Sequence, residues 1–120
     1  MKAIKIDAEN RKVEEIEVNG LPDMQKAVGG FIQVGHWFEL SDDVIYVDEE
    51  GLLKDPENFF TIRGKDSQIL AGNGLVLGTN ILTGAEMDAV TSIDYIKKNI
   101  CWMDVGTMSL YSALMEIANS

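Results

Sequence analysis

The sequence predicts a single α+β domain with a mostly antiparallel sheet, short helices and an apolar C-terminal helix. Short segments in which apolar and polar residues alternate, as in half-buried strands, occupy much of the first half. Helix start and stop signals occur between and after these segments, with no internal repeat, low-complexity tract or linker. A chain of 120 residues is long enough to bury a core, so we expect residues 1–120 to form one domain.

The N-terminal half predicts strands around one short helix. Residues 2–8 and 12–18 alternate on either side of the turn signal Glu9-Asn10-Arg11, which predicts a hairpin. A helix is expected to open at Asn19-Gly20-Leu21-Pro22 and to end at Gly29-Gly30, where glycine accepts a left-handed cap.

Two further strands are expected next. The first covers residues 31–40, where Gly35 marks a bulge or a close backbone approach, with one face made by Ile32, Val34, His36, Phe38 and Leu40. Residues 44–47 return antiparallel as a central strand, followed by a tight turn at Asp48-Glu49-Glu50-Gly51.

The middle of the chain combines a helix signal with a buried strand. Asp55-Pro56 is typical of an N-cap and a first-turn proline, so we expect a short helix through Phe59, Phe60 and Ile62. Leu75-Val76-Leu77 is an apolar run between glycines, which predicts a strand buried on both faces.

The C-terminal third predicts more helix. Two helix starts compete, at Thr83-x-x-Glu86 and at Thr91-x-x-Asp94. We favour a short hairpin through Gly84, a strand near residues 87–90 and a helix over residues 92–99. An extended segment over 100–105 and a helix over 107–118 follow, and the latter is apolar nearly all round.

Charge and composition exclude several classes. The net charge is −10, and residues 1–60 carry 14 acidic and 6 basic side chains, which argues against nucleic acid as a partner. No apolar run is long enough to cross a membrane, and the N-terminus lacks the apolar region of a signal peptide. The single cysteine, Cys101, suits a reducing compartment, so we expect a cytoplasmic protein.

Four segments, taken in order, resemble a known family. They are the opening Met-Lys-Ala-Ile-Lys-Ile-Asp, Ala27-Val28-Gly29-Gly30-Phe31-Ile32, Asp48-Glu49-Glu50-Gly51-Leu52-Leu53-Lys54 with Asn58 after it, and Gly72-Asn73-Gly74-Leu75-Val76-Leu77-Gly78. Over residues 1–80 the chain is similar to a family of small acidic proteins of unknown function from bacteriophages, plasmids and gut or Gram-positive bacteria. Residues 81–120 form a divergent tail. The resemblance implies a mobile-element origin, with work in host takeover or counter-defence, and it carries over no catalytic residue.

Residues that could support catalysis are scattered. Gly72-x-Gly74-x-x-x-Gly78 brackets a strand and lacks a following Gly-Lys-Ser/Thr, so structural glycines are favoured over a phosphate loop. Asp48-Glu49-Glu50 could offer oxygen ligands to Mg²⁺ or Ca²⁺, but neighbouring strand residues point to opposite faces and converge poorly. We expect His36 and Cys101 to be structural residues, and we predict no cofactor and no metal.

The sequence therefore predicts a non-enzymatic binding protein that occupies a host protein or associates with itself. Its partner surface is expected to be the acidic stretch Asp42–Glu57, which has seven carboxylates and one lysine, or the C-terminal helix. The helix would offer a homodimer interface through Leu110, Leu114 and Ile117. The expected polar contacts to a ligand or partner are Asp48, Glu49, Asn58, Arg63 and Asn73. A binder of a nucleotide signal and a small hydrolase around His36 or Asp48-Glu49-Glu50 remain alternatives.

Overall fold

The structure, a computed structural model, describes residues 1–38, 41–64 and 67–106. In these residues every strand pair is antiparallel, and two short α-helices accompany the strands, which confirms the predicted α+β class. The helix expected over 107–118, with Leu110, Leu114 and Ile117, lies outside the described residues.

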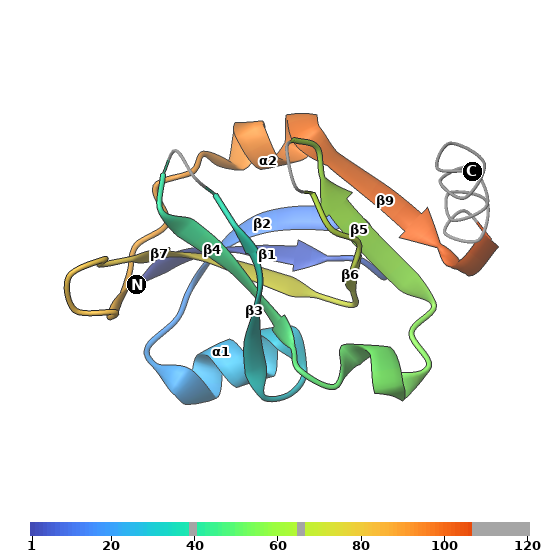
Figure 1. Ribbon diagram of the computed structural model, residues 1–120, viewed down its shortest axis with the longest axis horizontal. Helices are drawn as coiled ribbons and strands as arrows, with labels where there is room; N and C mark the ends of the chain where they lie inside the picture. Colours follow the sequence, from blue (N-terminus) through green and yellow to red (C-terminus); the bar gives the residue numbers. More distant parts are fainter. Residues whose placement is uncertain (39–40, 65–66, 107–120) are drawn as a thin grey trace, which may run out of the picture.

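The larger sheet has six strands, which are β1 (Lys2–Asp7), β2 (Lys12–Glu17), β3 (Ile32–Trp37), β4 (Asp43–Asp48), β7 (Gly74–Thr79) and β8 (Glu86–Met87). Five of them lie in the order β2-β1-β7-β4-β3, and β8 pairs with β7 (Figure 1). The first five residues of β7 are all buried, which confirms the predicted strand with two covered faces. The central strand of this order is β7. The sequence predicted β4 as the central strand, but β4 lies next to β7.

The smaller sheet has three strands, which are β5 (Asn58–Ile62), β6 (Leu70–Ala71) and β9 (Ile100–Asp104), in the order β6-β5-β9. The helix expected after Asp55-Pro56 was therefore wrong. Asn-Phe-Phe-Thr-Ile is rich in aromatic and β-branched residues, and it pairs with β9 over five residue pairs. A 3-10 helix (Gly51–Lys54) comes earlier, and Asp55 takes a left-handed conformation (φ 49°) in place of an N-cap.

The two helices cover opposite sides of the larger sheet (Figure 1). Helix α1 (Leu21–Val28) packs through Met24, Ala27 and Val28 against Leu75 and Leu77 on one face. On the other face, side chains of the smaller sheet and of helix α2 (Ile93–Asn99) join the main core, which contains Ile4, Ile6, Ile45, Phe60, Val76 and Ile96. The described part of the chain is thus a layered arrangement of helix, large sheet, and small sheet with helix.

Of the two alternatives at Gly35, the bulge is confirmed, because the register with β4 shifts between Val34 and His36. The site is also tightly packed, since a Cβ on Gly35 would lie 2.9 Å from Cδ2 of Leu70. The bulge also changes which side chains share a face. Val34 stands opposite Tyr46, on the α1 side, whereas His36 stands opposite Ile45, on the side of the smaller sheet. The single register expected for residues 31–40 was therefore wrong, and the bulge turns His36 toward a different space from Val34.

The predicted C-terminal end of α1 and the predicted start of α2 are both confirmed. Gly29 has a left-handed conformation (φ 89°) and its N–H donates to the carbonyl of Gln25 at 2.8 Å, which ends α1. Ser92 is the N-cap of α2, and its hydroxyl accepts the N–H of Tyr95 at 3.1 Å.

The glycines around β7 have packing reasons. A Cβ on Gly74 would lie 2.7 Å from Cζ of Phe60, and one on Gly78 would lie 2.5 Å from the carbonyl oxygen of Asp88. These close approaches, and the positive φ of Gly72 (74°), account for the Gly72-x-Gly74-x-x-x-Gly78 pattern without a phosphate ligand.

Candidate functional site

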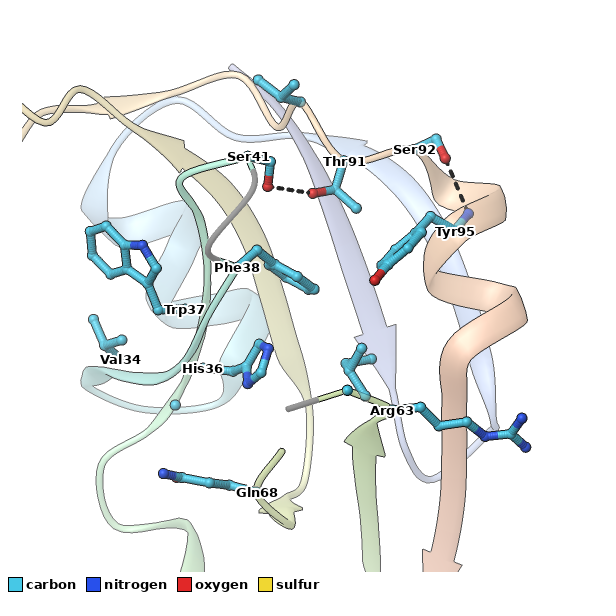
Figure 2. A pocket seen from close by; sticks show the side chains of 14 residues that line it. Val34, His36, Trp37, Phe38, Ser41, Arg63, Gln68, Thr91, Ser92 and Tyr95 are labelled. Atoms are coloured by element: carbon cyan, nitrogen blue, oxygen red, sulfur yellow. Dashed lines mark hydrogen bonds between the residues drawn. The ribbon is translucent and has the colours of Figure 1, made fainter. Parts of the chain in front are cut away.

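An open cleft of about 890 Å³ lies beside the second half of β3 (Figure 2). Three segments that are distant in sequence form its walls: the end of β3 with the following turn, the end of β5 with Gln68, and the segment that leads into α2. The lining residues are Val34, Gly35, His36, Trp37, Phe38, Ser41, Ile62, Arg63, Gly64, Gln68, Val90, Thr91, Ser92 and Tyr95.

The β3 wall presents the one histidine of the chain, His36, among aromatic rings. The His36 and Phe38 rings meet edge to face with centroids 4.9 Å apart, and Phe38 meets Tyr95 in the same way at 6.5 Å. Burial lowers the pKa of His36, so its imidazole is uncharged at neutral pH. In Figure 2, His36 and Tyr95 point into the same space.

The opposite wall is held by a buried carboxylate. Asp43, at the start of β4, has no exposed surface, and its Oδ2 accepts the N–H groups of Val90 at 3.0 Å and Thr91 at 2.6 Å. The hydroxyls of Ser41 and Thr91 lie 3.0 Å apart in a second link. Asp43 therefore ties the segment before α2 to β4, and so fixes the wall that faces His36.

The described lining residues favour hydrogen bonding and stacking. They offer one uncharged imidazole, one amide and the hydroxyls of Ser41, Thr91, Ser92 and Tyr95, with no Asp, Glu, Lys or Cys among them. Arg63 lines the cleft, but its guanidinium points away from His36 and Tyr95 (Figure 2). A histidine that acts as a base in hydrolysis is commonly oriented by a carboxylate, and this part of the lining supplies none.

Of the five predicted polar contacts, Arg63 lies at the cleft and the other four lie elsewhere. Asp48 ends β4, where it accepts Nζ of Lys54 at 2.6 Å and the N–H of Glu50 at 2.9 Å. Burial by itself raises the pKa of Asp48, but these hydrogen bonds and the charge of Lys54 outweigh it and hold the pKa below its ordinary value. Since Nζ of Lys54 also donates to the carbonyl of Gly29 at 3.1 Å, the pair joins the 3-10 helix to the end of α1.

The other three predicted contacts also have backbone partners in the fold. Glu49 is exposed, and its N–H donates to the carbonyl of Phe31 at 2.9 Å. Asn58 opens β5, and its carbonyl accepts the N–H of Gly72 at 3.0 Å. Oδ1 of Asn73 accepts the N–H of Ala8 at 3.3 Å. The structure therefore does not bring the five residues together in one site.

The carboxylates of the stretch Asp42–Glu57 are divided between the two ends of β4. Asp42 precedes the strand and Asp43 is buried within it, whereas the exposed residues Glu49, Glu50, Asp55 and Glu57 follow it. A strand of this length spans about 20 Å, so the stretch does not form one continuous charged face.

The described residues hold no group of three or more His, Cys, Asp or Glu side chains arranged to bind a metal ion. Cys101 packs with Phe59, Ala71 and Met103, on the face of the smaller sheet that points away from the main core. It is therefore separated by that sheet from His36. Within the described residues, no helix has the length and apolarity to span a membrane.

The cleft was not predicted from the sequence, although two of its parts were considered separately. His36 was expected to be structural and Arg63 was expected to contact a ligand. Asp43 was counted in the acidic stretch Asp42–Glu57 that was expected to meet a partner, and a carboxylate directly before the buried run Val44-Ile45 was the one available signal of its clamping role.

A family model described as a domain of unknown function (DUF3846) matches residues 1–100. The match reaches beyond the resemblance over residues 1–80 and includes α2 and all three segments that form the walls of the cleft. Neither the search of curated proteins nor the search of solved structures found a match.

Proposed function

We propose that this chain, which belongs to the DUF3846 family, is a non-enzymatic binding protein that holds a segment of another protein in the cleft between β3 and residues 90–95. The observation that carries the proposal is the lining of this cleft. It combines aromatic rings and an uncharged imidazole with hydroxyl and amide groups and the guanidinium of Arg63, and its described part has no carboxylate, amine or thiol. Its volume lies within the range of about 300–1,000 Å³ that is common for ligand sites.

The rim of the cleft supports a protein as the occupant. Val34 and Trp37, 50% and 45% exposed, carry apolar surface around the edge of β3 to its α1 side, and Val90 is 71% exposed at the opposite wall. Aromatic residues with apolar neighbours are enriched at protein interfaces, where they contribute a large share of the binding energy.

The resemblance to proteins of bacteriophages and plasmids supports a partner from the host cell. In this proposal the protein acts in the bacterial cytoplasm and occupies a host protein during takeover or counter-defence. The mode of action is occupancy, so no turnover and no cofactor are required.

A small-molecule binder is the second candidate, since the volume of the cleft and its neutral imidazole also suit an uncharged planar compound. The net charge of −10 disfavours phosphate ligands, so uncharged nucleosides are better probes of this candidate than nucleotides. A hydrolase would need a group to orient or assist His36, and the described lining contains no carboxylate for that task.

The test is to pan a displayed library of random peptides against the protein and to map each recovered peptide by amide chemical shifts. Peptides that shift Val34–Phe38 and Val90–Tyr95 support the proposal. Gln68→Trp, an exposed lining position, is expected to weaken them about tenfold or more, which is about 1.4 kcal/mol. Gln25→Trp, the same change on α1, is the control and is expected to leave binding unchanged.

Two results would overturn the proposal. Adenosine, guanosine, cytidine or uridine that shifts the same amides, when no peptide does, would establish the small-molecule candidate. Peptides that shift the amides of residues 49–57, and whose affinity is unchanged by Gln68→Trp, would place the binding site outside the cleft.

A further inference from the structure

The cleft adjoins an edge strand with an unusual composition. Within the described residues β3 pairs with β4 alone, so its other side has no strand partner. Natural edge strands are commonly protected by charged side chains or proline. The sequence Ile-Gln-Val-Gly-His-Trp-Phe over residues 32–38 contains no Asp, Glu, Lys, Arg or Pro.

The hydrogen-bond register shows which backbone groups face outward from this edge. The carbonyl of Phe31 accepts the N–H of Glu49, and the N–H of Phe38 donates to the carbonyl of Asp43. Bonded and non-bonded pairs alternate in an antiparallel ladder, so the pairs Val34–Tyr46 and Trp37–Val44 are non-bonded. The N–H and C=O groups of Val34 and Trp37 therefore point away from β4, and both residues also line the cleft.

We infer that the occupant of the cleft is an extended, positively charged segment of another protein that adds as a strand to the edge of β3 opposite β4. This inference rests on the proposed function and specifies its partner. Backbone hydrogen bonds to Val34 and Trp37 supply affinity, as in other cases of strand addition. One side chain of the segment enters the cleft beside the Phe38 and Tyr95 rings, which meet edge to face, and an aromatic or apolar group there has ring contacts available.

The charge of the partner follows from the field of this protein. The net charge is −10, and Asp42 and Asp94 directly neighbour the lining residues Ser41 and Tyr95, while the guanidinium of Arg63, the one charged group among the described lining residues, points away from His36 and Tyr95. Such a field attracts a basic segment and repels a second copy of the same chain. The bulge at Gly35 also interrupts the edge, which suits a short segment better than the long edge of another sheet.

The test uses a peptide recovered from the displayed library, resynthesised with N-methyl groups at alternate residues in two complementary patterns. An extended strand turns alternate N–H groups to opposite sides, so one pattern blocks the side that faces β3 and the other blocks the side that faces solvent. Loss of two hydrogen bonds is expected to weaken one pattern about tenfold or more while the other binds as the parent peptide does.

This test separates the strand-addition inference from the proposed function. A peptide that maps to the cleft but tolerates both patterns equally would overturn strand addition and leave the proposed function standing. Failure to recover any cleft-binding peptide would remove the proposed function itself. Val34→Pro, compared with Val34→Ala, repeats the test from the protein side, because proline removes one outward N–H and edge strands tolerate it.

Two further outcomes address the chemistry of the partner. Recovered peptides are expected to be basic, and an acidic consensus would overturn the charge assignment. Sedimentation of the free protein is expected to show a monomer. A dimer that shifts the amides of β3 without added peptide would identify a second copy as the occupant and overturn the inference.

Discussion

The two edge strands of the larger sheet, β2 and β3, differ in the charge of their side chains and in the regularity of their backbone. Strand β2 carries Lys12, Glu14, Glu15 and Glu17 among its six residues, whereas β3 carries no Asp, Glu, Lys or Arg. β3 has a bulge and borders a cleft with aromatic walls. Charged side chains on an edge oppose unplanned pairing, so β2 is the protected edge, and the proposed strand addition depends on the uncharged edge of β3.

The largest expected change in stability concerns the wall of the cleft, which borders β3 and not β2. Asp43→Ala leaves the partly buried N–H groups of Val90 and Thr91 without their acceptor, and we expect it to lower the free energy of unfolding by roughly 1–3 kcal/mol. Urea unfolding measures the loss. Asp43→Asn, which keeps one amide oxygen, is expected to lose less.

Hydrogen exchange separates a local effect from a general one. In Asp43→Asn the amides of Val90 and Thr91 are expected to exchange faster, while those of the β1–β2 hairpin keep their protection. Equal stability of Asp43→Ala and the wild type would contradict the clamp.

A smaller effect, on self-association, is expected when the charged side chains of β2 are removed. The double variant Glu14→Thr, Glu15→Thr eliminates like charges that would face each other between paired edges, at about 0.2–1 kcal/mol for each pair. Self-association is therefore expected at a several-fold lower concentration, measured by sedimentation velocity.

The matched control is Glu49→Thr, Glu50→Thr, which changes the net charge equally at exposed positions outside both edges. If both double variants associate alike, net charge and not edge protection governs solubility, and the comparison between β2 and β3 loses its basis.

The smallest expected effect is a pH dependence that belongs to β3. Burial lowers the pKa of His36 in the folded state, so the unfolded chain takes up a proton at a higher pH. The stability contributed by neutral His36 is complete above the unfolded pKa of about 6.5 and is lost as the pH falls below it. His36→Gln is expected to flatten this part of a series of urea midpoints. A parallel decline in variant and wild type would assign the dependence to other groups.

Local signals in the sequence predicted those elements whose formation is decided locally. The capping glycine Gly29, the bulge at Gly35 and the start of α2 near Ser92 are each set by a few neighbouring residues, and each is confirmed. The run Leu75-Val76-Leu77 predicted a strand covered on both faces because few other structures accommodate such a run between glycines.

The smaller sheet and the cleft depend on residues far apart in the chain, which explains why they were missed. Asp55-Pro56 is a good local helix signal, but the pairing of Phe59 with Met103 and of Phe60 with Trp102 outweighs it. The cleft forms only when the segments around residues 34–38, 62–68 and 90–95 come together in the fold, and no short sequence motif predicts that contact. Of the predicted contacts only Arg63 lies there, and the clamp by Asp43 emerges only when β4 and residues 90–91 are in place.

The pairing of β5 with β9 has a consequence for synthesis of the protein. Phe59 and Phe60 are translated some forty residues before their β9 partners, Met103 and Trp102. Until residues 100–104 have left the ribosome, β5 has no β9 strand to pair with. The nascent chain then exposes an apolar segment that can bind other proteins or aggregate. Chaperone contact during translation is therefore expected to concentrate on this segment and to cease once β9 emerges.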